Sequence, residues 1–410
     1  MKITQSKLLI LGANPETIPL VKVANDMGVY TIVTDYNPNA PAKKIAKKSF
    51  DVDGMDVANI VKLAKDENVD GVLVGVADLL VPIYHKVCQA LNFPCYATTM
   101  AIDVLSNKHN FKKMCESHGI KGVRDFQESE VEYPALIKPV DSCSGQGITI
   151  CRQKENLPQA ISKAMSASRS GHFIIEKYMT CDNVALYYTF MNGECYLSMM
   201  GDMNALELEK GSPVNLGNIY PSKHTKLYLN KFHGKFKSFF NHLGIRNGVL
   251  LIQAFVENDE FYVYDPGFRL QGEAPHILLN EINGFDHRKM LINFALTGVM
   301  EDAKFPNGND CYLGGKIAAT LWFLLSAGKI QKIDGMKNHD SRVIYLAQRL
   351  HEGDVVTSEM IGTEKQVLAR YYLVCNTIGE LKGLIKKLRD EIKVFDEFGK
   401  DMLIKINNFG

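Results

Sequence analysis

The first 96 residues alternate short apolar segments with amphipathic ones, and this alternation is the strongest constraint on the fold. The apolar segments are KLLILG, VYTIVTD, DGVLVGV and FPCYA, and the stretches between them are long enough for helices. Strands that alternate with helices form right-handed βαβ units on a parallel sheet. The sequence therefore predicts a doubly wound, Rossmann-like α/β domain over residues 1–105.

The pattern changes after residue 105, where antiparallel strands are expected. Ser106 is the expected N-cap of a helix that carries Lys108, and Gly119 lies where its C-cap is expected. The strands predicted after this helix are YPALIKPV, GITIC, HFIIEKYM, VALYYTFM, ECYLSMM, GVLLIQAFV and EFYVYDP, with ENDE as a hairpin turn between the last two. This favours an α+β domain over residues 106–300, followed by a small α+β domain over residues 301–410.

The overall composition excludes several classes of protein. Lys plus Arg is 47 and Asp plus Glu is 46, so the net charge of +1 makes nucleic acid an unexpected partner. No window approaches the roughly 18 apolar residues of a membrane span, and the first residues do not resemble an export signal. The nine cysteines are scattered and never form CxxC, which indicates neither a disulfide framework nor a zinc site. A reducing cytoplasm is the expected location.

The first strand–helix junction, LGANPET, lacks the glycines of a dinucleotide-binding GxGxxG motif. Asp35 ends the second strand about where an acid that binds ribose would lie. A dehydrogenase that binds NAD at Gly12 to Asn14 is therefore one alternative. The other is a Rossmann-like sheet that holds no nucleotide and in which Asp35 starts a turn.

The segment ALIKPVDSCSGQGITI combines a lysine on a strand with a glycine loop. Lys138 lies on the strand, and Gly145 and Gly147 lie in the loop that leads to the next strand. Backbone N–H groups of such a loop can approach phosphate oxygens while the lysine holds a positive charge against them. An ordinary glycine hairpin beside a surface lysine is the alternative.

Two further segments carry polar groups at strand ends. FIIEKYM places an acid before Tyr178 and Met179, whose backbone could clasp an adenine ring against an apolar slot. In LLIQAFVENDEFYVYDPGFRLQGE, a hairpin brings Gln253 and Asp265 side by side, as two oxygen ligands for Mg²⁺. Arg269 follows, where it can face a phosphoryl group or a substrate carboxylate. The alternative is a cross-strand polar pair with an arginine salt bridge.

In this order, the segments resemble the ATP-grasp superfamily, in the form found in carbamoyl-phosphate synthase large chains, biotin carboxylases and carboxylate-amine ligases. The resemblance implies a Rossmann-like pre-ATP-grasp domain, an ATP-grasp domain with a mobile lid subdomain over about residues 121–188, and a small C-terminal domain. It implies that Lys108 and Lys138 contact the phosphates of ATP and that Arg269 and Lys138 assist phosphoryl transfer. The loop that closes over the phosphates is formed by Ser142, Ser144, Gly145, Gln146 and Gly147.

The same resemblance assigns the adenine and ribose contacts. It implies that Glu176 faces the adenine amino group and that Lys177, Tyr178 and Met179 form the clasp. The family has a glycine and then a glutamate after the clasp, where this chain has Cys181 and Asn183. Asn183 is therefore the candidate for the ribose contact.

The metal signature also departs from the family pattern. The usual ExNxR appears here as DPGFR, so Asp265 replaces the glutamate and Gly267 replaces the asparagine. Glu273 is the candidate replacement ligand beside Gln253 and Asp265. A Mg²⁺ site weaker than that of relatives is expected.

The function implied is an ATP- and Mg²⁺-dependent ligase. It would activate a small carboxylate as an acyl phosphate, which an amine then attacks, with release of ADP and phosphate. Its expected partners are the small-molecule carboxylate and amine, with a homodimer as an option and neither nucleic acid nor a membrane. The alternative is a non-catalytic ATP-binding regulatory or assembly protein with a degenerate metal site, which Gly267 favours.

Overall fold

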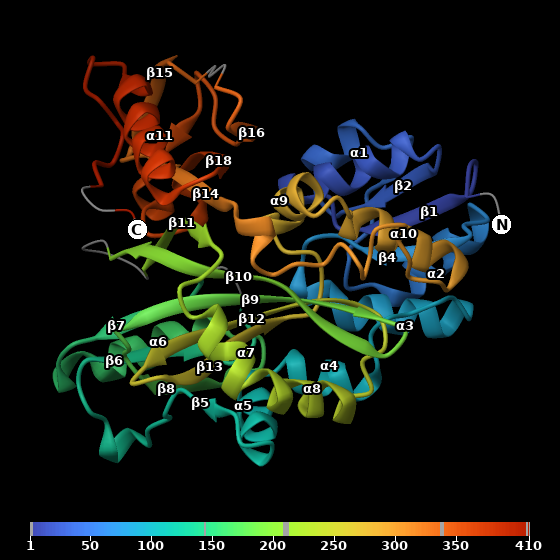
Figure 1. Ribbon diagram of the computed structural model, residues 1–410, viewed down its shortest axis with the longest axis horizontal. Coiled ribbons are helices and arrows are strands. Elements are labelled where there is room, and N and C mark those ends of the chain that lie inside the picture. Colours follow the sequence, from blue (N-terminus) through green and yellow to red (C-terminus); the bar gives the residue numbers. More distant parts are fainter. Residues whose placement is uncertain (1–2, 143–144, 208–212, 337–339, 407–408, 410) are drawn as a thin grey trace.

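The protein has a mixed α/β architecture built on four sheets (Figure 1). The computed structural model describes residues 3–142, 145–207, 213–336, 340–406 and 409, so Ser144 of the predicted phosphate loop lies outside the described residues. The predicted fold class is confirmed, because a parallel sheet is followed by largely antiparallel ones. In the part of the chain that is described, every helix is too short or too polar to cross a lipid bilayer.

The N-terminal sheet is parallel and has the strand order β3-β2-β1-β4. Its strands are β1 (Lys7–Leu11), β2 (Tyr30–Thr34), β3 (Lys48–Phe50) and β4 (Gly71–Val74), and its helices are α1 (Ile18–Asp26), α2 (Val57–Asp66) and α3 (Val81–Leu91). Leu8 to Leu11 are fully buried, as expected of a parallel strand covered by helices. The distant helix α10 (His287–Thr297) returns to pack on β4 and α1 (Figure 1).

The prediction of a strand at FPCYA is wrong. Residues 92–98 form an irregular segment between α3 and α4 (Thr99–Leu105). Pro94 has no N–H to donate to a strand, and the N–H of Tyr96 donates to the hydroxyl of Tyr84. The Tyr96 ring packs 5.0 Å from that of Tyr84 and 5.1 Å from that of Phe268. Aromatic packing has replaced strand pairing here.

The helix that carries Lys108 is α5 (Lys108–Ser117), and its N-cap is Asn107, not Ser106. The Asn107 side chain accepts hydrogen bonds from two backbone N–H groups of the first turn, at 3.0 and 3.1 Å. Ser106 instead ends the preceding helix. Gly119 follows α5 with a φ of +70°, which confirms the expected C-terminal stop.

A small three-stranded sheet and one helix form a unit with its own core, which we name the lid. Its elements are β6 (Ala135–Pro139), β7 (Thr149–Cys151), β8 (Phe173–Lys177) and α6 (Leu157–Ala167), with strand order β7-β6-β8. Figure 1 shows the lid apart from the N-terminal sheet, with the central sheet between them.

The central sheet has the order β16-β18-β14-β11-β10-β9-β12-β13-β5. Its strands are β5 (Lys121–Gly122), β9 (Asp182–Met191), β10 (Glu194–Leu206), β11 (Val214–Tyr220), β12 (Gly248–Glu257), β13 (Glu260–Gly267), β14 (Ile317–Leu324), β16 (Val343–Gln348) and β18 (Val367–Cys375). The ENDE turn is confirmed, since Asn258 and Asp259 both have positive φ between β12 and β13. Strand β11 was not predicted, because Asn and Gly interrupt its apolar pattern.

The remaining helices and strands complete the central and C-terminal regions. They are α7 (Thr225–Lys231), α8 (His233–His242), α9 (Pro275–Ile282), β15 (Gly328–Asp334), β17 (Val355–Val356), α11 (Ile378–Glu391) and β19 (Lys393–Asp396). A second apolar core lies between α11 and strands β14 and β18. Because β14 and β18 also extend the central sheet, that sheet runs across the predicted boundary at residue 301, and the domain limits stay a prediction.

The N-cap of α5 allows a direct test. Asn107→Ala should lower the free energy of unfolding by about 1 kcal/mol, because two backbone donors lose their acceptor. Ser106→Ala is the matched control and should change it by less than about 0.5 kcal/mol. Urea denaturation of both variants measures the difference. Equal losses would show that the cap contributes nothing.

Candidate functional site

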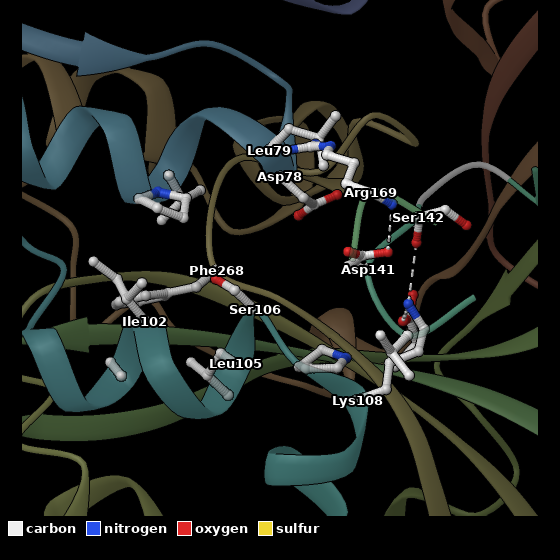
Figure 2. Close-up of a pocket in the computed structure, with 16 residues that line it drawn as sticks. Asp78, Leu79, Ile102, Leu105, Ser106, Lys108, Asp141, Ser142, Arg169 and Phe268 are labelled. Atoms are coloured by element: carbon white, nitrogen blue, oxygen red, sulfur yellow. Dashed lines mark hydrogen bonds and ion pairs between the residues drawn. The ribbon is translucent and has the colours of Figure 1, made fainter. Parts of the chain in front are cut away.

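The candidate site lies where the lid, the N-terminal domain and the central sheet meet. A cavity of about 140 Å³ lies there. In Figure 2, Asp78 and Leu79 lie on one side of it and Ile102 and Leu105 of α4 on another. Lys108 and Ser142 also line it, and so does Asp265. Residues that are far apart in the sequence are therefore brought together around one space.

Lys108 begins α5 and reaches two of the predicted site groups. Its Nζ lies 2.9 Å from Oδ1 of Asp265 and donates to the carbonyl of Ser142 at 3.2 Å. Burial opposes the charge of this lysine, but the carboxylates of Asp265, Glu176 and Asp78 together outweigh burial and hold the pKa of Lys108 above its usual value. The structure thus places a phosphate-binding candidate directly against a metal-ligand candidate.

Lys138 and Glu176 form a buried ion pair inside the lid. The Lys138 Nζ lies 2.6 Å from Oε2 of Glu176, and the two residues are 3% and 1% exposed. Burial lowers the pKa of Lys138. Burial raises the pKa of Glu176, but the charges of Lys138 and Lys112 lower it by more, so the pKa of Glu176 lies below its usual value. Both oxygens of Glu176 therefore face lysines, which differs from the expectation that this residue faces an adenine amino group.

Lys112 is a site residue that the sequence interpretation missed. Its Nζ lies 2.7 Å from Oε1 of Glu176, contacts Asp125 and donates to the carbonyl of Val123 at 3.0 Å. It is 3% exposed although α5 is otherwise polar. The available signal was its position one turn after Lys108 and directly after the buried Phe111.

The adenine clasp is only partly available in this structure. The backbone N–H of Lys177 donates to the carbonyl of Arg124 at 2.9 Å, and the Tyr178 hydroxyl donates to Glu207 at 2.8 Å. Met179 is 7% exposed, which fits an apolar slot. Asn183, the ribose candidate, donates to the hydroxyl of Tyr264 at 3.1 Å. Met179 is therefore the strongest of the clasp candidates.

The described part of the glycine loop needs its glycines for structural reasons. Gly145 and Gly147 both have a φ of +75°. A Cβ at position 147 would lie 2.5 Å from that of Ala167 and 2.8 Å from Cγ of Pro139. The Ser142 hydroxyl donates to the carbonyl of Gln146 at 2.8 Å. These glycines would be required in a plain hairpin as well as in a phosphate loop.

The metal candidates separate into two groups. Gln253 and Asp265 are paired residues of β12 and β13, so the predicted cross-strand placement is confirmed. Glu273 is elsewhere engaged: its oxygens accept from Tyr187 at 2.7 Å, Asn218 at 3.0 Å and Asn215 at 3.1 Å. Burial raises the pKa of Glu273, which also disfavours the charged form. This arrangement argues against Glu273 as the replacement ligand.

The donor set that remains suits a Mg²⁺ ion that arrives with nucleotide phosphates. Gln253 and Asp265 offer hard oxygen atoms, but only one carboxylate. Among the described residues, no group of three His, Cys, Asp or Glu side chains could hold a metal alone. The protein thus provides part of a coordination sphere, and phosphate oxygens can supply the rest.

The space beside Gly267 is occupied by the side chains of Asp78 and Gln271, so a larger residue at this position would be crowded. A Cβ on Gly267 would lie 3.3 Å from Oδ1 of Asp78 and 3.3 Å from Oε1 of Gln271. The other oxygen of Asp78 pairs with Arg269, whose Nη1 also donates to the carbonyl of Leu270 at 2.7 Å. Asp78 was missed, although it lies in the segment that follows the carboxyl end of β4, and ligands of such sheets bind beyond the carboxyl ends of the strands.

The dinucleotide alternative gains no support from the first strand–helix junction. The Asp35 carboxylate accepts from the N–H of Ala13 at 2.9 Å and from that of Asn37 at 2.9 Å. A Cβ on Gly12 would lie 3.0 Å from a methyl carbon of Leu80. Asp35 therefore shapes its own loop, as the alternative without a nucleotide expected.

Comparison with known proteins agrees with this geometry. A family model described as D-ala D-ala ligase C-terminus matches residues 105–201. In structure, the chain is similar to an L-amino acid ligase from Bacillus licheniformis, with a TM-score of 0.80, 16% identity and coverage of 96% of this chain and 99% of that one. The chain has the ATP-grasp fold. The resemblance seen in the sequence is confirmed.

Two further matches extend the ATP-grasp comparison. The biotin carboxylase domain of a Hydrogenobacter thermophilus 2-oxoglutarate carboxylase, solved with MgADP and bicarbonate, gives a TM-score of 0.76 at 14% identity, over 97% of this chain and 91% of that one. A formate-dependent phosphoribosylglycinamide formyltransferase from Wolinella succinogenes is 24% identical over 62% of this chain and 68% of its own length. The chain spans about half the length of further relatives of that name.

The buried ion pair of the lid predicts a large loss of stability. Glu176→Gln should lower the free energy of unfolding by about 3–5 kcal/mol, because two buried lysines lose a shared counter-charge. The control is Glu132→Gln, which removes an exposed pair with Arg124 and should cost less than about 1 kcal/mol. Urea denaturation followed by hydrogen exchange in the lid checks both. A Glu176→Gln variant as stable as the control would refute the pair's importance.

Proposed function

We propose that this protein is an ATP- and Mg²⁺-dependent ligase that joins a small carboxylate to an amine. The observation that carries the proposal is the meeting of α5 and the lid: Lys108 of α5 pairs with Asp265 at 2.9 Å, and Lys138 of the lid pairs at 2.6 Å with Glu176, which also binds Lys112 of α5. Two lysines from separate units can hold a triphosphate between them. The relatives support a small carboxylate, since a formate-dependent formyltransferase and an L-amino acid ligase are among them.

The reaction proceeds in two steps, phosphoryl transfer to the carboxylate and attack by the amine. A carboxylate oxygen attacks the γ-phosphorus of ATP, and the β–γ bridging oxygen leaves with its electron pair as ADP. The amine nitrogen then attacks the acyl carbon, the bond to phosphate breaks, and the amine loses a proton as phosphate departs. No protein nucleophile is needed, so positioning and charge stabilisation supply the acceleration.

The chain's own residues have separate tasks in this scheme. Lys108 and Lys138 bind the phosphates, while Arg269, fixed by Asp78, stabilises charge on the transferring group. Gln253 and Asp265 would hold Mg²⁺ beside the phosphates. When bound, the ion neutralises phosphate charge and polarises the phosphoryl group. Met179 supports the adenine ring.

Binding of the nucleotide should depend on Lys138. Lys138→Met should weaken ATP binding by about 2 kcal/mol, because a charge-assisted contact is lost, while adenosine binding should barely change. Lys154→Met, at an exposed lid lysine, is the control. Calorimetry with both ligands measures the effect. Equal ATP affinity in the Lys138 variant and the parent would remove Lys138 from the phosphate site.

Turnover should depend on Asp265 more than binding does. Asp265→Asn should reduce ADP release by about 100-fold or more and change ATP affinity far less, because the ion's contribution grows as charge develops in the transition state. Glu273→Gln should leave metal dependence unchanged. The assay is ADP release over a panel of carboxylates and amines.

The same assay decides between this function and the alternative. Full activity in Asp265→Asn would refute the metal assignment. ATP binding without ADP release in the parent, over the whole panel, would favour the non-catalytic ATP-binding protein that Gly267 suggested. We further propose a cytoplasmic location, which fractionation of cells tests, and a homodimer is tested by sedimentation analysis.

A further inference from the structure

The cavity of about 140 Å³ has two chemically different sides. Ile102, Leu105 and Phe268 form an apolar side, and Leu79 lies across the cavity beside Asp78. The opposite side carries charged groups from the lid, α5 and β13. Phe268 is 4% exposed and held by the Tyr96 ring, so the apolar wall is rigid. A ligand that fits both sides has an ionic head and an apolar body.

The cavity is distinct from the place proposed for adenine. None of the clasp residues Glu176 to Met179 lines it. Lys108 and Asp265 do line it, so it opens onto the phosphate end of the nucleotide site. Phosphate groups do not suit the apolar wall, because their charges would lose hydration without gaining partners. The cavity is therefore placed for the molecule that receives the γ-phosphoryl group.

The charges around the cavity show which end of that molecule they would bind. Lys108 is already paired with Asp265 at 2.9 Å. The guanidinium group of Arg169, in contrast, has no ion-pair or hydrogen-bond partner among the residues that the structure describes. Arg169 lines the cavity from the turn between α6 and β8 (Figure 2). An arginine in this position can form two parallel hydrogen bonds to a carboxylate.

The turn that carries Arg169 is itself fixed. Asp141 accepts from the Ser168 hydroxyl at 2.7 Å, from the Ser170 N–H at 2.9 Å and from the Arg169 N–H at 3.3 Å. Asp141 lies just beyond the end of β6, the strand that carries Lys138. The position of Arg169 is thus coupled to the phosphate-binding strand of the lid.

We propose that this cavity is the carboxylate subsite, that it selects a carboxylate with a short apolar chain, and that Arg169 binds the ionic head. This proposal rests on the proposed function. An apolar cavity of about 150 Å³ accepts a molecule of the size of benzene, so head and chain together have up to about six carbons in this cavity of about 140 Å³. Aliphatic amino acids and plain aliphatic acids both combine a carboxylate with a short apolar chain.

Chain length and polarity of the substrate test the apolar wall. In ADP-release assays, kcat/KM should rise about fourfold per added methylene from acetate to hexanoate or from glycine to leucine, and then fall. Leucine should exceed its polar isostere asparagine by at least tenfold, and pentanoate should exceed succinate similarly. Which series is active distinguishes amino acids from plain acids. A preference for the polar members would overturn the proposal.

Variants of α4 test the location of the subsite. Ile102→Asn should raise the KM of the apolar acid at least tenfold with little change in the KM of ATP. Ile102→Ala, which keeps the helix, should shift the preferred chain length upward by one or two carbons. Met100→Asn lies on the same helix, is exposed and does not line the cavity, so it should behave as the parent. Identical chain-length profiles in all variants would refute the location.

A lid variant tests the ionic head. Arg169→Gln should raise the KM of the acid at least tenfold and leave the KM of ATP within about threefold, and Arg169→Lys should recover part of the loss. Lys154→Gln is the control for charge on the lid. An increase in the KM of ATP alone would assign Arg169 to the nucleotide and overturn its role here.

Direct binding separates failure of this proposal from failure of the proposed function. Hexanoate and leucine are titrated into the protein by calorimetry with a non-hydrolysable ATP analogue present. One outcome is that the parent binds hexanoate or leucine, that Ile102→Asn does not, and that no substrate gives ADP release. This outcome would support the subsite and refute the ligase activity. ADP release that is insensitive to both Ile102 and Arg169 would leave the ligase standing and refute the subsite.

Discussion

The pairing of Glu176 with Lys112 and Lys138 is the interaction on which the rest of the site depends. These three residues are each at most 3% exposed, and their charges are stable only because Glu176 pairs with both lysines and Asp125 also pairs with Lys112. Lys112 belongs to α5, Lys138 and Glu176 to the lid. The pair of Lys112 with Glu176 therefore fixes where the lid lies against α5, and the pair of Lys138 with Glu176 holds the Lys138 ammonium where phosphate can compete for it.

A second contact, between Asp78 and Arg269, connects the N-terminal domain to the same region. Asp78 also fills the space beside Gly267. A side chain at position 267 would crowd this contact. The glycine that replaces the asparagine ligand of the family therefore leaves room for the ion pair between Asp78 and Arg269. The structure thus gives a packing reason for Gly267 in place of the usual asparagine, and this reason does not require that activity has been lost.

The comparison between sequence and structure shows where local patterns are sufficient. Periodicity identified β1, β2, β4, β12 and β13, because each carries a buried apolar stretch bounded by turn residues. It failed at FPCYA, where Tyr96 is held by aromatic rings, and at β11, whose polar residues bond within the sheet interior. Asn107 was passed over as a cap because Ser106 is equally suitable in composition, and only the backbone geometry distinguishes them.

The sequence by itself determined the order of the functional segments, since a strand lysine, a glycine loop and a hairpin with opposed polar residues can be recognised from residue type and spacing. It also indicated that Gln253 and Asp265 lie on paired strands, although the register of the turn alone would oppose Gln253 to Tyr264, and a β-bulge between Gln253 and Ala254 brings Asp265 opposite instead. Only the tertiary structure decided that Lys112 is buried against Glu176, that Glu273 is already engaged, and that Asp78 and Arg169 line a common cavity. These facts depend on contacts between residues far apart in the chain, which no local pattern encodes.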